Sequence, residues 1–181
     1  MIQQKLLKQV VIVLISLILV GQVTGETHLD AHVHGEAKMM IVLENNQLFI
    51  EIETPAMNVL GYEHPPENKQ QQQGLKQAVQ TFEQSSQIIK LHGGFCLPHS
   101  QNVETPGLEH KADSPYHDHN AHTEFHISYI WTCKNARDLK EIELSLFEHF
   151  PGFDMIRAQW IFTRGQGAAT LDSKHRLIKV K

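Results

Sequence analysis

Two runs of alternating residues, joined by a short polar turn, place the strongest constraint on the fold of this chain. Apolar side chains occupy every odd position of residues 37–43 and every even position of residues 48–52. Successive side chains of a strand point to opposite faces, so each run buries one face. Asn45 and Asn46, in the connecting "ENNQ", tolerate the positive φ of a tight turn. The sequence therefore predicts a β-hairpin over residues 36–53.

The rest of the chain supplies further strands and one long helix. Apolar residues alternate with polar ones over residues 124–133, which predicts another strand. Further strand candidates are Glu141–Leu146, Arg157–Thr163, Ala168–Asp172 and Arg176–Val180. Leu75, Ala78, Val79, Phe82 and Ile89 recur at helical spacing, and the Pro-rich segment 54–66 reads as a loop or a single helical turn. We expect an α+β fold: a mostly antiparallel sheet domain of about seven strands with one long helix.

The amino-terminal segment has the pattern of a secretory leader. Lys5 and Lys8 precede an apolar stretch over 10–20, and the small residues Val23 and Gly25 suit a signal-peptidase site. The alternative is an uncleaved anchor, but that stretch is shorter than the ~20 residues that cross a bilayer. We expect residues 1–25 to be a signal peptide and residues 26–181 to form a single domain without a membrane span.

Charge argues against nucleic acid as a partner. The chain has 16 basic and 20 acidic residues. Removal of the leader takes Lys5 and Lys8 with it, which leaves 14 basic residues against 20 acidic ones and a net charge of −6. Nucleic-acid binding needs a basic surface, whereas an acidic surface attracts cations.

The chain contains two cysteines, Cys96 and Cys133. An even pair in an exported protein is usually a disulfide. The alternative, two free thiolates that hold a metal, conflicts with an oxidising compartment. The sequence therefore predicts a Cys96–Cys133 disulfide, worth about 4 kcal/mol for the loop it closes on the chain-entropy model.

Thirteen histidines occur in the chain, and their placement suggests a metal site. His32 and His34 are two residues apart, as are Glu124 and His126, so each pair points to one side of an extended segment. His64 precedes a double proline that keeps its backbone extended. Imidazole and carboxylate ligands without thiolate favour Zn²⁺, with Cu²⁺ and Ni²⁺ as competitors. Our predicted primary metal site consists of His32, His34, His64, Glu124 and His126.

Residues 99–123 lack apolar periodicity and are rich in Pro, Asp, Asn and His. We expect a flexible His/Asp-rich loop here, with a secondary and more exchangeable metal site. Its ligands would be His110, His117, His119 and His122. The isolated histidines at positions 92, 99, 149 and 175 read as ordinary surface residues.

Two enzyme motifs resemble parts of the chain but fit poorly. "DAHVHG" resembles the metal-binding strand of amidohydrolases, yet those are barrels of typically 250 residues, longer than this chain. "HDHNAH" resembles the metallo-β-lactamase motif, but Ala121 stands where that motif has aspartate. HExxH and GxSxG are absent from the sequence. We expect a protein that is not an enzyme.

Three stretches together resemble the ZrgA-type periplasmic zinc-binding proteins, formerly a bacterial domain of unknown function. They are "HVHGEAKMMIVLENNQLFIEIETPAMNVLGYEH", "HTEFHISYIWTC", and "LSLFEHFPGFDMIRAQWI" with the following "GQ" at 165–166. The resemblance spans most of residues 32–180, interrupted by a variable His/Asp-rich loop. It implies a periplasmic protein of Gram-negative bacteria, made under zinc scarcity, with the five primary ligands and the two paired cysteines named above.

The expected function is therefore capture of Zn²⁺ in the periplasm and its passage to an ABC-type zinc importer. One alternative is a periplasmic metal buffer or stress protein that has no delivery partner. Another is a copper- or nickel-binding protein that uses the same ligands.

Overall fold

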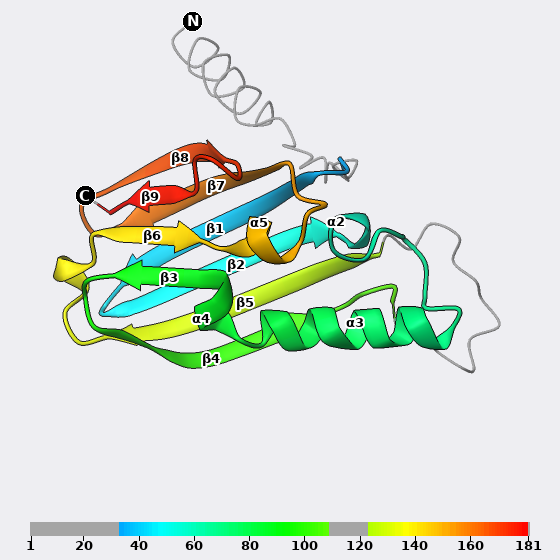
Figure 1. Ribbon diagram of the computed structural model, residues 1–181. Coiled ribbons are helices and arrows are strands. Elements are labelled where there is room, and N and C mark those ends of the chain that lie inside the picture. The colour runs from blue at the N-terminus through cyan, green and yellow to red at the C-terminus, as the bar shows by residue number, and fades with distance from the viewer. Residues whose placement is uncertain (1–32, 109–122, 181) are drawn as a thin grey trace, which may run out of the picture. The chain divides into compact units, whose positions relative to one another are not determined.

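The computed structural model describes residues 33–108 and 123–180. His32 and the four loop histidines, like the predicted signal peptide, lie outside these residues. The described chain forms nine strands and several short helices (Figure 1). The strands are β1 (Glu36–Glu44), β2 (Gln47–Pro55), β3 (Ile89–His92), β4 (Cys96–Glu104), β5 (Glu124–Cys133), β6 (Glu141–Leu144), β7 (Met155–Phe162), β8 (Gly165–Leu171) and β9 (Leu177–Lys179). The helices are α2 (Ala56–Leu60), α3 (Lys69–Phe82), α4 (Ser85–Ile88), the 3-10 turn η1 (Ala136–Asp138) and α5 (Leu146–His149).

The strands form two sheets, which confirms the predicted α+β class. The larger sheet has six strands in the order β4-β5-β2-β1-β7-β8, and only its β1–β7 pair is parallel. The smaller sheet, β3-β6-β9, is antiparallel. In Figure 1 the smaller sheet and the helices lie against one face of the larger sheet, and we call this its core face. We call the opposite face the open face.

Alternation along the strands explains why one face of the large sheet is covered. Ile41 of β1, Ile50 of β2 and Tyr129 of β5 are neighbours across the strands and are all buried on the core face. Their sequence neighbours, such as Glu51 on β2, point to the open face and are more exposed. Burial of such apolar area is worth about 25 cal/mol per Å², so it fixes which face of each strand turns inward.

The predicted hairpin is confirmed as β1 and β2. Residues Glu44 and Gln47 pair across a turn in which Asn45 and Asn46 have φ of +49° and +66°. Asparagine is among the few residues that adopt this conformation readily, so the "NN" pair sets the register of the whole hairpin.

The predicted helix is shorter than the apolar pattern suggested. Asn68 caps α3 by accepting a hydrogen bond from the Gln71 N–H at 3.0 Å, and the helix ends at Phe82. Ile89, which continues the helical spacing, belongs instead to β3. Phe82 explains the docking of α3, since its ring stacks on Phe150 and its carbonyl accepts the buried Tyr129 hydroxyl at 2.7 Å.

The expected loop over 99–123 is wrong in its first part. Residues 99–104 belong to β4, which pairs with β5 along the edge of the large sheet. The alternation rule failed here because most side chains of this edge strand are exposed on both faces, so no apolar period marks it. The rest of the expected loop, 109–122, lies outside the described residues.

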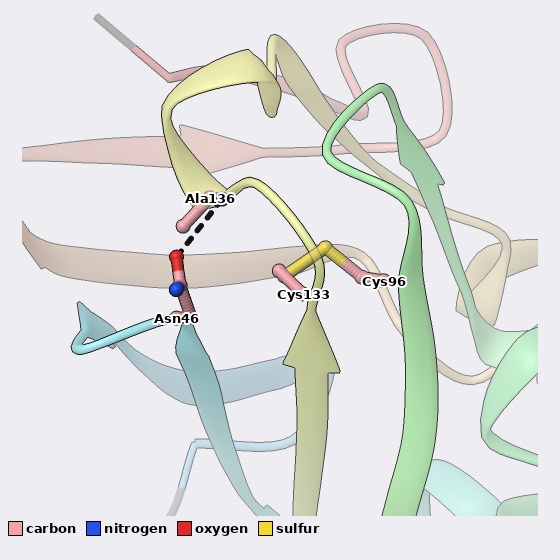
Figure 2. Close-up of a disulfide and its surroundings, with 4 residues drawn as sticks. All are labelled: Asn46, Cys96, Cys133 and Ala136. Atoms are coloured by element: carbon pink, nitrogen blue, oxygen red, sulfur yellow. Dashed lines mark hydrogen bonds between the residues drawn. A yellow bond between two sulfur atoms is a disulfide. The ribbon is translucent and has the colours of Figure 1, made fainter.

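A disulfide joins Cys96 and Cys133, as predicted (Figure 2). The two cysteines are paired neighbours at the start of β4 and the end of β5. Beside them, the Asn46 side chain accepts a hydrogen bond from the Ala136 N–H at 3.2 Å. The disulfide therefore fixes the end of the large sheet that also carries the β1–β2 turn.

Candidate metal site

The opposite end of the large sheet collects histidine and carboxylate side chains. Because β2 runs antiparallel to both β1 and β5, its last residue Pro55 lies opposite Glu124, the first residue of β5. β1 also begins at this end (Figure 1), two residues after His34. We call this region the site end of the sheet. It carries His34 just before β1 and Glu124 and His126 on β5, from two distant parts of the sequence.

A buried asparagine holds the chain in place just before β1. The Asn58 Oδ1 accepts a hydrogen bond from the Gly35 N–H at 2.6 Å, and its Nδ2 donates to the Glu36 carbonyl at 2.9 Å. The same Nδ2 donates to the Thr54 hydroxyl oxygen at 3.0 Å. Asn58 is 3% exposed, so these bonds form in a medium of low dielectric where they are strongest. Asn58 thereby fixes the backbone next to His34.

The position after the "HVH" triplet requires glycine because of its backbone conformation and the close approach of Asp154. Gly35 has φ of +84°, and a Cβ there would lie 2.2 Å from the Asp154 Oδ2. Its carbonyl accepts hydrogen bonds from the N–H groups of Asp154 at 2.8 Å and Met155 at 3.0 Å. This turn ties the start of β1 to the start of its parallel neighbour β7.

His34 pairs with a carboxylate that the sequence did not single out. Its Nε2 lies 3.1 Å from the Glu63 Oε1, and the two side chains are 56% and 36% exposed. Glu63 follows α2, which ends where Gly61 adopts φ of +78° and donates its N–H to the Met57 carbonyl. The pair offers one nitrogen and one carboxylate oxygen that an incoming cation can reach.

His64 lies in the same segment, beside this pair in sequence. Its ring stacks on Tyr62, with centroids 4.8 Å apart, and its Nδ1 lies 2.9 Å from the Pro65 carbonyl oxygen. In the tautomer that carries the proton on Nδ1, this nitrogen donates to that carbonyl and leaves Nε2 as the metal-binding atom. Burial of the neighbouring Tyr62 raises the pKa of its hydroxyl.

Glu124 and His126 form the second pair of the site end. The Glu124 Oε2 lies 2.8 Å from the His126 Nε2, and both side chains lie on the open face of β5. Carboxylates commonly bind one nitrogen of a histidine whose other nitrogen holds a metal. In that arrangement His126 would present Nδ1 to the ion, and Glu124 would orient the ring.

The sheet register adds two glutamates that sequence reasoning missed. His126 pairs with Glu53 on β2 and with Glu104 on β4. Side chains at directly paired positions start about 5 Å apart on the same face, so both carboxylates can rotate toward the imidazole. With Glu124, they place three carboxylates around His126, beside Lys38, which pairs with Glu53 from β1. No signal in the sequence alone reveals them, because only strand pairing brings them to His126.

The segment 109–122 starts and ends at the site. Before it, the Pro106 carbonyl accepts the Glu124 N–H at 3.2 Å, and after it, the Thr123 carbonyl accepts the Ala56 N–H at 2.9 Å. The chain on both sides is thus held against β2 and β5.

The predicted primary set is only partly assembled in the described residues. His34 pairs with Glu63 and His126 with Glu124, whereas His64 lies near Glu67 at 3.8 Å. Over residues 33–108 and 123–180, no three His, Cys, Asp or Glu side chains meet closely enough to hold a metal ion. The site end therefore offers two-ligand pairs within this part of the chain.

Similar pairs occur elsewhere on the surface. His92 lies 3.0 Å from Glu143 on the small sheet, and His175 lies 3.2 Å from Asp172 on the turn after β8. A cavity of about 450 Å³ lies at the disulfide end, but Lys134, Arg137 and Arg164 line it together with asparagines. Cationic side chains repel a metal ion, so this cavity is unsuited to zinc.

Fold and site together define a small α+β protein that presents imidazole–carboxylate pairs at one end of a mixed sheet. The family model described as "ZrgA family zinc uptake protein" matches residues 31–180, and the chain belongs to this family. Membership gives the protein a role in zinc uptake. None of the curated proteins compared with the chain matches it. Among the described residues, no helix is both long enough and apolar enough to span a membrane.

Proposed function

We propose that this protein captures Zn²⁺ in the periplasm and passes it to an ABC-type zinc importer, without catalysing a reaction. The proposal places the ion at the site end of the large sheet. His34, His64 and His126 supply nitrogen ligands there, and Glu124 acts as a ligand or orients His126. His32 and the histidines at 110, 117, 119 and 122 supply further ligands from segments joined to the site end.

The observation that supports this assignment is the pairing of exposed imidazoles with carboxylates at one end of the sheet. His34 with Glu63 and His126 with Glu124 each provide two ligand atoms, the second pair on strand β5. Zinc takes four ligands in its closed sites, so each pair lacks two. The chain enters and leaves the His-rich segment beside the second pair, and this segment can supply the missing nitrogens.

Calorimetric zinc titration of single and double variants tests the site. We expect His32→Ala/His34→Ala and His126→Ala each to weaken tight binding by about tenfold or more, because each removes nitrogen ligands. His92→Ala is the matched control, since it removes an imidazole with the same Nε2–carboxylate geometry on the small sheet. Unchanged affinity in both site variants would defeat the assignment. Binding should also weaken as pH falls through the ordinary range of imidazole, near ~6.5.

The alternative of a metal buffer makes a different prediction for the His-rich segment. Residues 109–122 can be replaced by a Gly/Ser linker of equal length, which keeps the hydrogen bonds of Pro106 and Thr123 and all of β4. A buffer would lose most of its capacity, whereas a delivery protein would keep one tight site. Elemental analysis of protein isolated from the periplasm would then decide between zinc, copper and nickel.

Delivery itself requires a recipient. Zinc-loaded protein should transfer its ion to the purified periplasmic component of a zinc ABC importer faster than zinc dissociates into buffer. Transfer at the rate of free dissociation would remove the delivery step and leave the buffer alternative.

A further inference from the structure

The two edges of the large sheet differ in how they are protected. β4, at one edge, contains Pro98 and a register shift between Pro98 and Ser100, two devices that prevent a foreign strand from pairing. β8, at the other edge, reads "GQGAATL" and has neither proline, nor bulge, nor any charged residue. Natural edge strands usually carry at least one such protection, so the bare edge of β8 is an exception within its own sheet.

The outer edge of β8 leaves main-chain groups available for pairing. Every second residue of an edge strand points its N–H and C=O away from the sheet. Across residues 33–108 and 123–180, β8 hydrogen-bonds as a strand only to β7. Its residues 165–170 are exposed or half-buried, so a partner strand can approach.

We propose that β8 pairs with the β8 strand of a second copy of this chain, joining two six-stranded sheets edge to edge. A two-fold axis perpendicular to the sheet makes such a contact antiparallel and keeps the open faces of both copies on the same side. With the axis at Ala168, Gln166 of each copy lies opposite Thr170 of the other, and no charged residue meets a like charge within the strands. The proposal goes beyond the role in zinc uptake and does not depend on it.

Charge complementarity at the strand ends favours a second copy of this chain as the partner of β8 and favours this register. Arg164 precedes β8 by one residue and Asp172 follows it by one, so both are four residues from Ala168. The two-fold axis therefore places Arg164 of each copy opposite Asp172 of the other, at both ends of the contact. The Asp172 carboxyl is held in its charged form, since hydrogen bonds from the His175 ring and from the N–H groups of His175 and Lys174 lower its pKa.

Neighbouring registers lack this complementarity. Moving the axis to Ala169 places Arg164 opposite Lys174, which is repulsive, and moving it to Gly167 places Arg164 opposite the uncharged Thr170. Moving it by half a residue would set core-facing residues against open-face residues. A contact of two seven-residue strands is small, so we expect a weak dimer that forms at high protein concentration.

Sedimentation equilibrium of the purified protein in EDTA, up to millimolar concentration, tests the proposal without interference from zinc bridges. We expect a reversible monomer–dimer equilibrium. Ala168→Lys should raise its dissociation constant by at least about tenfold, because the axis sets the two new ammonium groups against each other. Gln159→Lys is the matched control: Gln159 pairs with Ala168 from β7 and is exposed on the same face, but no second copy pairs there.

Disulfide cross-linking tests the same contact without lysine, which could disturb β8 itself. Both native cysteines are already in a disulfide, so an introduced cysteine is the single free thiol of the described residues. Mild oxidation should convert Ala168→Cys, but not Gln159→Cys, into a cross-linked dimer, since directly paired Cβ atoms lie about 5 Å apart. A monomer at every concentration, a dimer that Ala168→Lys leaves intact, or equal cross-linking of the two cysteine variants would each overturn the proposal.

Discussion

Replacement of Asn58 by alanine should destabilise the protein strongly, because this side chain joins three segments at the site end. The substitution removes the hydrogen bonds to Gly35, Glu36 and Thr54. Each is worth about 1 kcal/mol net, and the buried groups left without partners keep the total near 3 kcal/mol. The side chain is 3% exposed, so water enters too little to compensate.

Urea unfolding of the zinc-free protein measures this effect. With an m-value of about 2 kcal/mol/M, the loss lowers the unfolding midpoint by roughly 1.5 M. Asn102→Ala is the control: its side chain is exposed and hydrogen-bonds Glu104 on the open face, and we expect a change below about 0.5 kcal/mol. If both variants shifted the midpoint equally little, Asn58 would not hold the turn before β1.

Zinc provides a second readout of the same variant. A ligand that binds only the folded state at about 100 times its dissociation constant adds about 2.7 kcal/mol of stability. On the proposed site, zinc at that excess nearly offsets the loss at Asn58. A tenfold loss of affinity in Asn58→Ala/His126→Ala should cut this benefit to about 1.4 kcal/mol. Equal stabilisation by zinc in the single and double variants would place the ion elsewhere.

Three further predictions concern other parts of the molecule. Cys96→Ser/Cys133→Ser should lose about 4 kcal/mol of stability in urea unfolding yet keep its zinc affinity, because the disulfide closes the opposite end of the sheet. A tenfold loss of zinc affinity in calorimetry would contradict the second expectation. The His175 ring and the neighbouring N–H groups lower the pKa of Asp172. The Asp172 carboxylate should therefore stabilise the fold above its ordinary pKa of 3.8, and this stabilisation should be lost as pH falls through its folded pKa. An NMR titration that gives the ordinary pKa would refute this. Glu53→Gln/Glu104→Gln should weaken zinc binding by up to about tenfold, whereas Glu51→Gln should not, because Glu51 pairs with Ser128 rather than His126. Equal calorimetric titration curves for the two proteins would show that Glu53 and Glu104 do not contribute to the zinc site.

Local sequence patterns predicted the strands that bury one face and expose the other. The β1–β2 hairpin follows from strict alternation and two asparagines that accept positive φ, and the disulfide follows from cysteine count and expected compartment. β4 was missed because its side chains are exposed on both faces, so the hydrophobic effect leaves no period in its sequence. Its pairing depends on main-chain hydrogen bonds to β5, to which every residue type except proline contributes equally.

The candidate site shows the same division between local and long-range information. Glu124 and His126 are two residues apart on one strand, so their pairing could be inferred from the strand period alone. The pairing of His34 with Glu63 depends on α2 ending at Gly61 and on Asn58 holding the turn before β1. These are contacts between distant segments, and they cannot be predicted from local patterns in a single sequence.

A site divided into two-ligand pairs suits a protein that must release its metal as well as bind it. Imidazole and carboxylate ligands on rigid strands hold a cation weakly when only two of them are present, and affinity rises as further ligands join. In the proposed mechanism those additional ligands come from separate segments of the chain. Withdrawal of one segment by a recipient would then return zinc to a two-ligand pair, from which it leaves quickly. On that mechanism, a site divided in this way would combine tight capture with fast transfer in one protein.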